Sequence, residues 1–225
     1  MTAVNPVSFD TIKLIWRPAP RKARRVVATL IRRFGAYTFN YDGPDLVAAQ
    51  NEGFSGYPGM EDVSKDYSHQ AMVAFASRLI SRERPDFDRI VSAWGASPEM
   101  DDFTLLGLTF GRLPTDMYEF IPKIAPIPGT CFFTDLAGLQ SHTPSEAFRL
   151  SPPGTPLVLR RNPANEHDGK AVEVLLDGEI VAHVKKVHCE SVCEAFDAGL
   201  SVSCELVRVL LNGVIKQVVV KIQYL

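Results

Sequence analysis

Two short polar segments contain the residues of this chain that are best suited to bind a ligand. The first, residues 162–169, reads Asn-Pro-Ala-Asn-Glu-His-Asp-Gly, and the second, residues 182–186, reads Ala-His-Val-Lys-Lys. A carboxylate such as Asp168 accepts a hydrogen bond from a hydroxyl group but repels a phosphate, whereas lysines attract a phosphate. The first segment is also typical of a turn between strands, since Asn, Asp, Gly and Pro each favour turn conformations. Taken by itself, it favours the turn interpretation.

The order and spacing of the two segments resemble the HIRAN domain. That family has a strand, an Asn-Pro-x-Asn-x-x-Asp loop, a strand of small aliphatic residues, and a Gly/Ala-His-Leu/Val-Lys/Pro-x step that leads into a helix. The resemblance implies a small OB-like β-barrel that binds single-stranded DNA or DNA 3′ ends. In members that bind DNA ends, the loop Asn and Asp bond the terminal nucleotide, and the Asp accepts from its free 3′-hydroxyl.

Carried over residue by residue, the resemblance implies nucleotide contacts in the loop and at the end of the following strand. The loop residues are Asn165, Asp168 and the adjacent His167, and His183 is a further contact. The carboxylate of Asp168 would then select a strand end over a continuous strand, because it accepts from a hydroxyl and repels a phosphate. The alternative, that Asn165 and Asp168 only cap a turn, stays open at this stage.

Basic and aromatic residues near the loop affect how strongly a strand end is held. Lys185 and Lys186 stand at a predicted helix N-terminus, where they could hold the preceding phosphate. DNA-binding HIRAN members also supply a basic residue and aromatics just after the first strand, which stack on the terminal bases. The corresponding segment here is Gly-Leu-Gln-Ser-His-Thr, in which Gln140 cannot stack and His142 stacks only weakly. Gln140 and His142 are therefore expected as contacts that lack an aromatic platform.

The first half of the chain resembles the N-terminal β-rich domain of HipA-type proteins. The resemblance rests on Tyr-Thr-Phe-Asn-Tyr-Asp at residues 37–42 and on Asp-Asp-Phe-Thr-Leu-Leu at residues 101–106, followed by a segment that reaches Pro122. In those kinases this domain precedes the catalytic lobes, but this sequence has no Gly-rich nucleotide loop and no His-Arg-Asp-type catalytic loop. Together the two resemblances imply a bacterial or prophage protein.

Hydrophobic periodicity predicts an α+β fold with two domains. Three prolines and a glycine at residues 122–129 mark the boundary between a HipA-N-like domain, residues 1–124, and a HIRAN domain, residues 125–225. The first is expected to be β-rich with several helices, and the second a small OB-like barrel with one or two helices. Strands are expected at residues 7–16, 25–31, 36–41, 117–121, 130–139, 156–160, 171–176, 179–184, 201–211 and 214–224. Helices are expected at residues 45–52, 69–81, 86–94, 100–108 and 185–200.

A basic run between Arg17 and Arg33 contains seven Lys or Arg residues and no acidic residue. Such a run could follow a phosphate backbone. More often such a run is a solvated face or pairs with an acidic loop, such as the one with Glu61, Asp62 and Asp66, and the solvated face is the favoured interpretation.

Metal binding and catalysis find little support in the sequence. His183, His188, Cys189 and Cys193 lie close in sequence, but no pair of Cys-x-x-Cys motifs is present, and cysteines on a packed helix usually fill a core. No nucleophile-elbow pattern and no cysteine in an activating context occurs. We therefore predict no metal, no cofactor and no catalytic residue.

The composition is typical of a soluble intracellular protein. The 225 residues are 46% hydrophobic with a net charge of −2, so any basic surface must be local. Four cysteines suit a reduced cytoplasm, the N-terminus is unlike a signal peptide, and no apolar stretch of about 18 residues predicts a membrane span. We predict a cytoplasmic, non-enzymatic protein that binds single-stranded or terminal DNA. The alternative is a protein-interaction module whose N-terminal domain docks a kinase or another partner, and a hydrolase ranks third.

Overall fold

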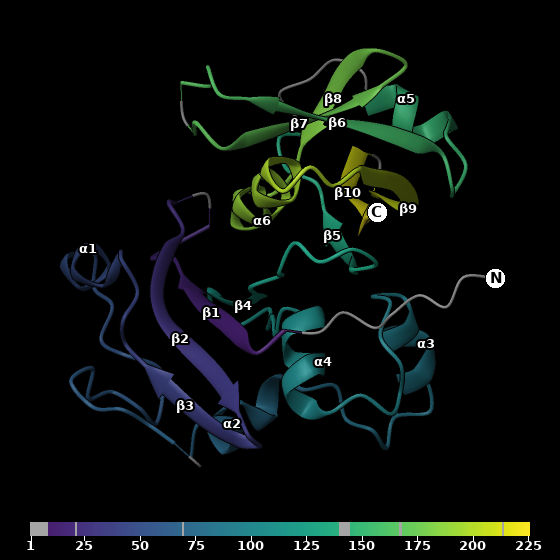
Figure 1. Cartoon of the computed structure of the whole chain (residues 1–225). Helices are drawn as coiled ribbons and strands as arrows, with labels where there is room; N and C mark the ends of the chain where they lie inside the picture. Colours follow the sequence, from purple (N-terminus) through teal and green to yellow (C-terminus); the bar gives the residue numbers. More distant parts are fainter. Residues whose placement is uncertain (1–8, 21, 69, 140–144, 167, 213) are drawn as a thin grey trace. The chain divides into compact units, whose positions relative to one another are not determined.

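The computed structural model describes residues 9–20, 22–68, 70–139, 145–166, 168–212 and 214–225. They divide into two compact units, residues 9–123 and Ile124–Leu225, and Figure 1 labels the helices and strands of each. The boundary expected from the sequence, between residues 124 and 125, lies beside this division.

The first unit is built on a four-stranded antiparallel sheet with the strand order β3-β2-β1-β4. At the start of β1 the residues alternate between polar and apolar over Thr11–Leu14, which places Ile12 and Leu14 in the core. The β2–β3 hairpin turns at Phe34 and Gly35, whose φ angles of 49° and 78° are both positive, as a two-residue turn of type I′ requires. The strands are β1 (Thr11–Trp16), β2 (Arg25–Arg33), β3 (Ala36–Asn40) and β4 (Tyr118–Pro122).

Short helices accompany this sheet, and all four helical segments expected here from the sequence occur. The expected helix at residues 69–81 is wrong in length, because α2 is followed by a single 3-10 turn, η1, which ends at Arg78. Arg78 is buried and ion-paired with Asp116, and its Nη1 donates to the carbonyl of Gly111 at 2.9 Å. The spacing of apolar residues in the sequence cannot predict such a tertiary contact, so it overestimates the length of this helix. The helices are α1 (Leu46–Asn51), α2 (Gln70–Phe75), η1 (Ala76–Arg78), α3 (Phe87–Ser92) and α4 (Asp102–Leu108).

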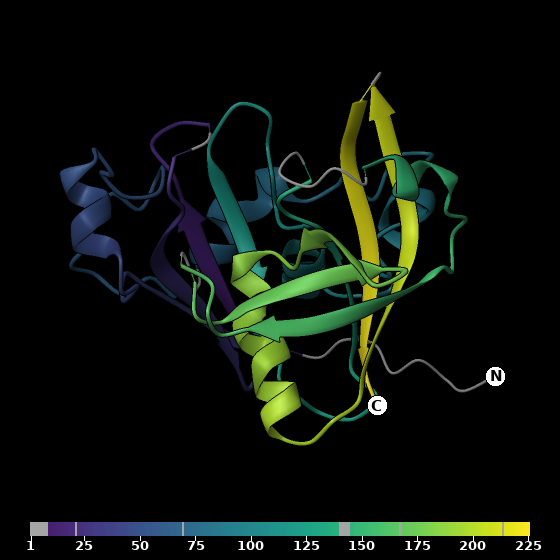
Figure 2. The same ribbon diagram turned by 90° about the horizontal axis from the view of Figure 1, so that it is seen from above.

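The second unit contains a six-stranded antiparallel sheet with the strand order β5-β10-β9-β6-β7-β8. Figure 2 shows the long β9–β10 hairpin in yellow and the green strands β6 and β7. Helix α6 packs on β7 and β9, and β7 is buried along its whole length. The elements are β5 (Cys131–Asp135), α5 (Ser145–Leu150), β6 (Pro156–Asn162), β7 (Ala171–Leu176), β8 (Glu179–His183), α6 (Lys186–Asp197), β9 (Val202–Asn212) and β10 (Val214–Tyr224).

The expected barrel is not closed by a continuous ladder of hydrogen bonds. The sheet is open between its edge strands β5 and β8, and the described residues join these two edges through one isolated bridge, between Ala137 and His183. Two hydrogen bonds form this bridge, from Ala137 N to His183 O at 2.8 Å and from His183 N to Ala137 O at 2.9 Å. Ala137 lies just beyond β5, so a single pair of residues replaces a full strand pairing. The chain is thus a mixed α and β protein that is mostly sheet.

Among the residues that the structure describes, none of the helices has the length and apolar character needed to cross a membrane.

Candidate functional site

One cavity of the second unit brings together residues from both polar segments of the sequence. Its volume is about 360 Å³. Small apolar residues of β7 and of the segment after β8, together with the thiol of Cys189, form much of its wall. Four polar side chains line it, namely Asn165, Asp168, His183 and Lys186. Segments that are separate in sequence therefore contribute to one site.

The loop between β6 and β7 is held by its own polar side chains. Asn165 Oδ1 accepts a hydrogen bond from Asp168 N at 3.1 Å, and Asp168 Oδ1 accepts one from Lys170 N at 3.0 Å. The turn interpretation of the sequence is therefore confirmed. It does not exclude a second role for Asp168, because a carboxylate has two oxygens and about four lone-pair sites. Turn capping fixes the position of this carboxylate at the cavity.

His183 is placed at the cavity by its backbone. It ends β8, is the register partner of Glu173 on β7, and forms the isolated bridge with Ala137 described above. Its half-buried side chain lines the cavity. Pairing with β7 on one side and with Ala137 on the other fixes the backbone of His183, so its imidazole ring has a defined position from which to contact a ligand.

The two neighbouring lysines at the start of α6 have different environments. Lys186 is the first residue of this 12-residue helix, is exposed and lines the cavity. Lys185 precedes the helix, is buried, and forms an ion pair with Asp135 of β5. The structure therefore assigns Lys185 to a buried ion pair and leaves Lys186 as the lysine of the cavity. Its ammonium group adds to the partial positive charge of the helix N-terminus, and both favour an anion.

Three further residues expected at the site, His167, Gln140 and His142, lie outside the described residues.

A buried carboxylate that the sequence analysis missed anchors the loop. Glu173 is the one polar residue of β7, whose sequence is Ala-Val-Glu-Val-Leu-Leu, and it is buried. It accepts hydrogen bonds from Asn162 Nδ2 and from Arg160 Nε, both at 2.8 Å. Asn162 is the first residue of the polar segment, so this carboxylate holds the start of the loop. The sequence signal that could have identified Glu173 is its position as a single acidic residue within an otherwise apolar strand.

The cysteines at α6 are packing residues in this structure. Burial raises the pKa of the Cys189 thiol to about 12, and Cys193 is also buried with a raised pKa. His188 packs on the ring of Phe132 with 5.3 Å between ring centroids. In the part of the chain that the structure describes, no group of three or more His, Cys, Asp or Glu residues is arranged to hold a metal ion.

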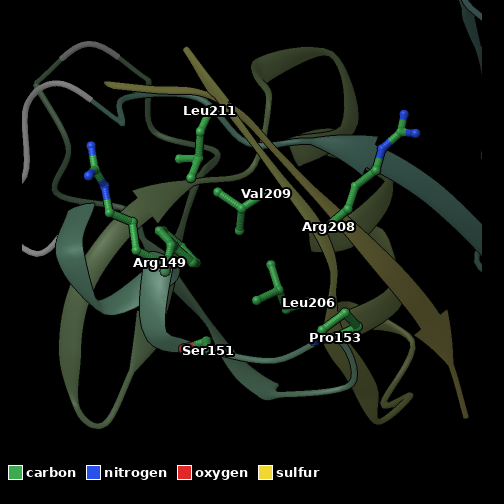
Figure 3. A pocket seen from close by; sticks show the side chains of 8 residues that line it. Arg149, Ser151, Pro153, Leu206, Arg208, Val209 and Leu211 are labelled. Carbon is green, nitrogen blue, oxygen red and sulfur yellow. The ribbon is translucent and has the colours of Figure 1, made fainter. Parts of the chain in front are cut away.

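A second cavity of the same unit, of about 300 Å³, lies beside β9 and α5 and is mainly apolar (Figure 3). Leu206, Val209 and Leu211 line it, and Figure 3 shows Arg149 and Arg208 on opposite sides of these side chains. Its hydroxyl residue, Ser151, donates to a helix carbonyl at 2.8 Å. Polar groups do not converge here as they do in the first cavity.

Two arginines of the basic run in the first unit form ion pairs with carboxylates outside the acidic loop of residues 61–66. Arg25 pairs with Glu52, and Arg32 with Asp101. Of the acidic loop named in the sequence analysis, Asp62 pairs with Lys65 at 3.2 Å. These two arginines therefore pair with carboxylates at the end of α1 and the start of α4 rather than with that loop.

Comparisons with known proteins add one structural likeness. Neither a protein-family model nor a curated protein matches the chain. The crystal structure of the HIRAN domain of human HLTF is similar to part of it, with 18% identity, a TM-score of 0.36, and coverage of 42% of this chain and 74% of that one. A TM-score of 0.36 is too low to establish a common fold, so no property of that domain is assigned to this chain on this basis.

Proposed function

We propose that this chain is a non-enzymatic nucleic-acid-binding protein, and that the cavity at Asn165, Asp168, His183 and Lys186 receives the end of a DNA strand. The observation that supports the proposal is the convergence of these four polar side chains, from the β6–β7 loop, the end of β8 and the start of α6, on one cavity. Its volume of about 360 Å³ falls in the range of small-ligand sites.

The chemistry of the cavity suits a strand end better than a continuous strand. Asp168 can accept a hydrogen bond from a terminal hydroxyl, but its negative charge repels a phosphate at the same place. Lys186 and the N-terminus of α6 supply positive charge for the phosphate that precedes the terminal nucleotide. One acceptor and one cation in the same cavity would therefore read a hydroxyl and a phosphate together.

Binding of this kind would be weak and dependent on salt. The described residues that line the cavity include no Phe, Tyr or Trp, so stacking, worth about 1–3 kcal/mol per base, is not supplied by them. The remaining attraction is electrostatic, and affinity should fall as salt concentration rises. Removing Lys186 should reduce the dependence of log K on log salt by about one unit.

The test is a fluorescence-anisotropy titration of the full chain with two labelled oligonucleotides that differ only in a 3′-hydroxyl or a 3′-phosphate. We expect tighter binding of the 3′-hydroxyl end. Asp168→Asn keeps the shape and an oxygen for the Lys170 N–H bond but removes the charge, so the variant should lose this preference. Glu166→Gln removes an exposed charge from the same loop and serves as the matched control. Equal binding of both ends, unchanged in Asp168→Asn, would contradict end recognition.

A further inference from the structure

Three arginines of the first unit surround one buried carboxylate. Glu119 of β4 is buried, and Arg24 Nη2 and Arg112 Nη2 lie 3.2 and 3.3 Å from its two oxygens. Arg17 Nη2 lies 4.0 Å from the oxygen that Arg24 contacts. Arg17 follows β1, Arg24 precedes β2 and Arg112 precedes β4, so the adjacent strands of the sheet bring the three guanidinium groups together. We call these four residues the arginine cluster.

The arginine cluster places three guanidinium groups beside one carboxylate. Like charges held this close repel one another, and long arginine side chains at a surface can separate at little cost. Their convergence is easier to maintain when a second anion is present.

Arg17 provides an independent sign that a partner belongs here. Its Nη2 is too far from Glu119 for a hydrogen bond, and its buried Nε has no acceptor among the residues that the structure describes. A buried donor without a partner costs about 1–3 kcal/mol, which an ordered water or ion would recover. The three arginine side chains are 28, 34 and 33% exposed, so an anion can reach them from solvent.

The arginine cluster is also partly preorganised. The guanidinium carbon of Arg112 lies 5.0 Å from the centre of the Phe110 ring, a cation–π contact that limits its motion. Planar guanidinium groups bind phosphate oxygens through two parallel N–H bonds, a geometry that lysine does not offer. We propose that the arginine cluster binds a phosphate group, either of a free phosphate or of a nucleic-acid backbone.

The proposal does not require DNA binding at the cavity of the second unit. If the phosphate belongs to a nucleic acid, the cluster adds a contact to the backbone, which by itself carries no sequence information. If it belongs to a small molecule, the first unit has a ligand of its own.

The experiment uses the full chain with two probes, inorganic phosphate and a DNA oligonucleotide blocked with phosphate at its 3′ end. Binding of inorganic phosphate is measured by calorimetry at constant ionic strength, and binding of the oligonucleotide by anisotropy. Arg17→Ala should weaken binding about tenfold, as expected for one charge-assisted hydrogen bond. Arg33→Ala removes an exposed arginine of the same basic run and should bind as the wild type does. Glu119→Gln should bind phosphate more tightly.

The outcomes separate this proposal from end recognition. An effect of Arg17→Ala on inorganic phosphate supports the site with a free phosphate as ligand, and an effect on the oligonucleotide alone supports it with a nucleic-acid backbone. The difference in phosphate affinity between Arg17→Ala and the otherwise identical chain should persist when both carry Asp168→Asn, since Asp168 belongs to the second unit. If Arg17→Ala and Arg33→Ala bind both probes equally well, the proposal is overturned, whether or not Glu119→Gln folds.

Discussion

Ala137 and His183 exchange two backbone hydrogen bonds, of 2.8 and 2.9 Å, and both residues line the polar cavity of the second unit. The same contact therefore links the two edges of the six-stranded sheet and fixes one wall of the candidate site. Because the edges meet only here among the described residues, the stability of the bridge and the shape of the cavity should change together.

Replacing Ala137 with proline tests this coupling. Proline lacks the N–H that donates to His183 O, so Ala137→Pro should lower the free energy of unfolding by about 1–3 kcal/mol and weaken oligonucleotide binding. Ala137→Ser retains the N–H and is the control. Urea unfolding followed by circular dichroism gives the stability. Equal stability and equal binding of the two variants would mean that the bridge contributes to neither.

Much of the fold could be predicted because local signals agree with the tertiary structure. The segment Ala171–Leu176 is an uninterrupted apolar and β-branched run apart from Glu173. The Asn-Gly pair at positions 212–213 of the sequence predicts a hairpin, and β9 and β10 are paired antiparallel. The way in which the two edges of the sheet meet, through one bridge and not through a full strand pairing, could not be predicted in the same way. It depends on the pairing of Ala137 with His183, which are distant in sequence and carry no local signal for each other.

Lys185 and Lys186 should show opposite effects on stability and on binding. Lys185→Met removes the ion pair with the mostly buried Asp135 and should cost about 3–5 kcal/mol of stability, while Asp135→Asn in the same chain should recover part of it. Lys186→Met changes an exposed residue and should alter stability by less than about 0.5 kcal/mol, but it should weaken DNA binding. Urea unfolding and anisotropy on both variants check this. A stable Lys185→Met chain would contradict the assigned roles.

Lys185 and Lys186 also show which part of the site could not be predicted from the sequence. The motif identified the loop, His183 and the lysines as candidates, but two adjacent lysines look alike in sequence. Which one enters the core depends on where α6 begins and on Asp135 of a distant strand. The buried partner of the loop, Glu173, was missed because a single acidic residue did not alter the apolar pattern of its strand.

Asp101 should stabilise the first unit in a way that depends on pH. Its Oδ1 accepts from Thr104 N at 2.8 Å at the start of α4. Burial by itself would raise the pKa of Asp101, but this hydrogen bond and the charge of Arg32 together lower it below 3.8. Asp101→Ala should cost about 1 kcal/mol near neutral pH.

The sign of the pH dependence follows from the lowered pKa of Asp101. Its contribution is present above the unfolded value of 3.8 and is lost as pH falls through the lower folded value. The difference in stability between the wild type and Asp101→Ala should therefore shrink as the pH falls below 3.8, as measured by thermal unfolding. Asp102→Ala, which removes the neighbouring exposed carboxylate, should cost less. A difference between wild type and Asp101→Ala that persists unchanged in acid would argue against the cap.

The thiols should be unreactive in the folded protein. Burial raises the pKa of Cys189 and of Cys204 to about 12, from 9.0 for an exposed thiol. At pH 8 the thiolate fraction is therefore very small, and alkylation followed by mass spectrometry should label these residues only after addition of urea. The stabilisation from burying the neutral thiols is complete below pH 9 and is lost as pH rises toward about 12. Rapid labelling of Cys189 in the native chain would show that the wall of the cavity opens.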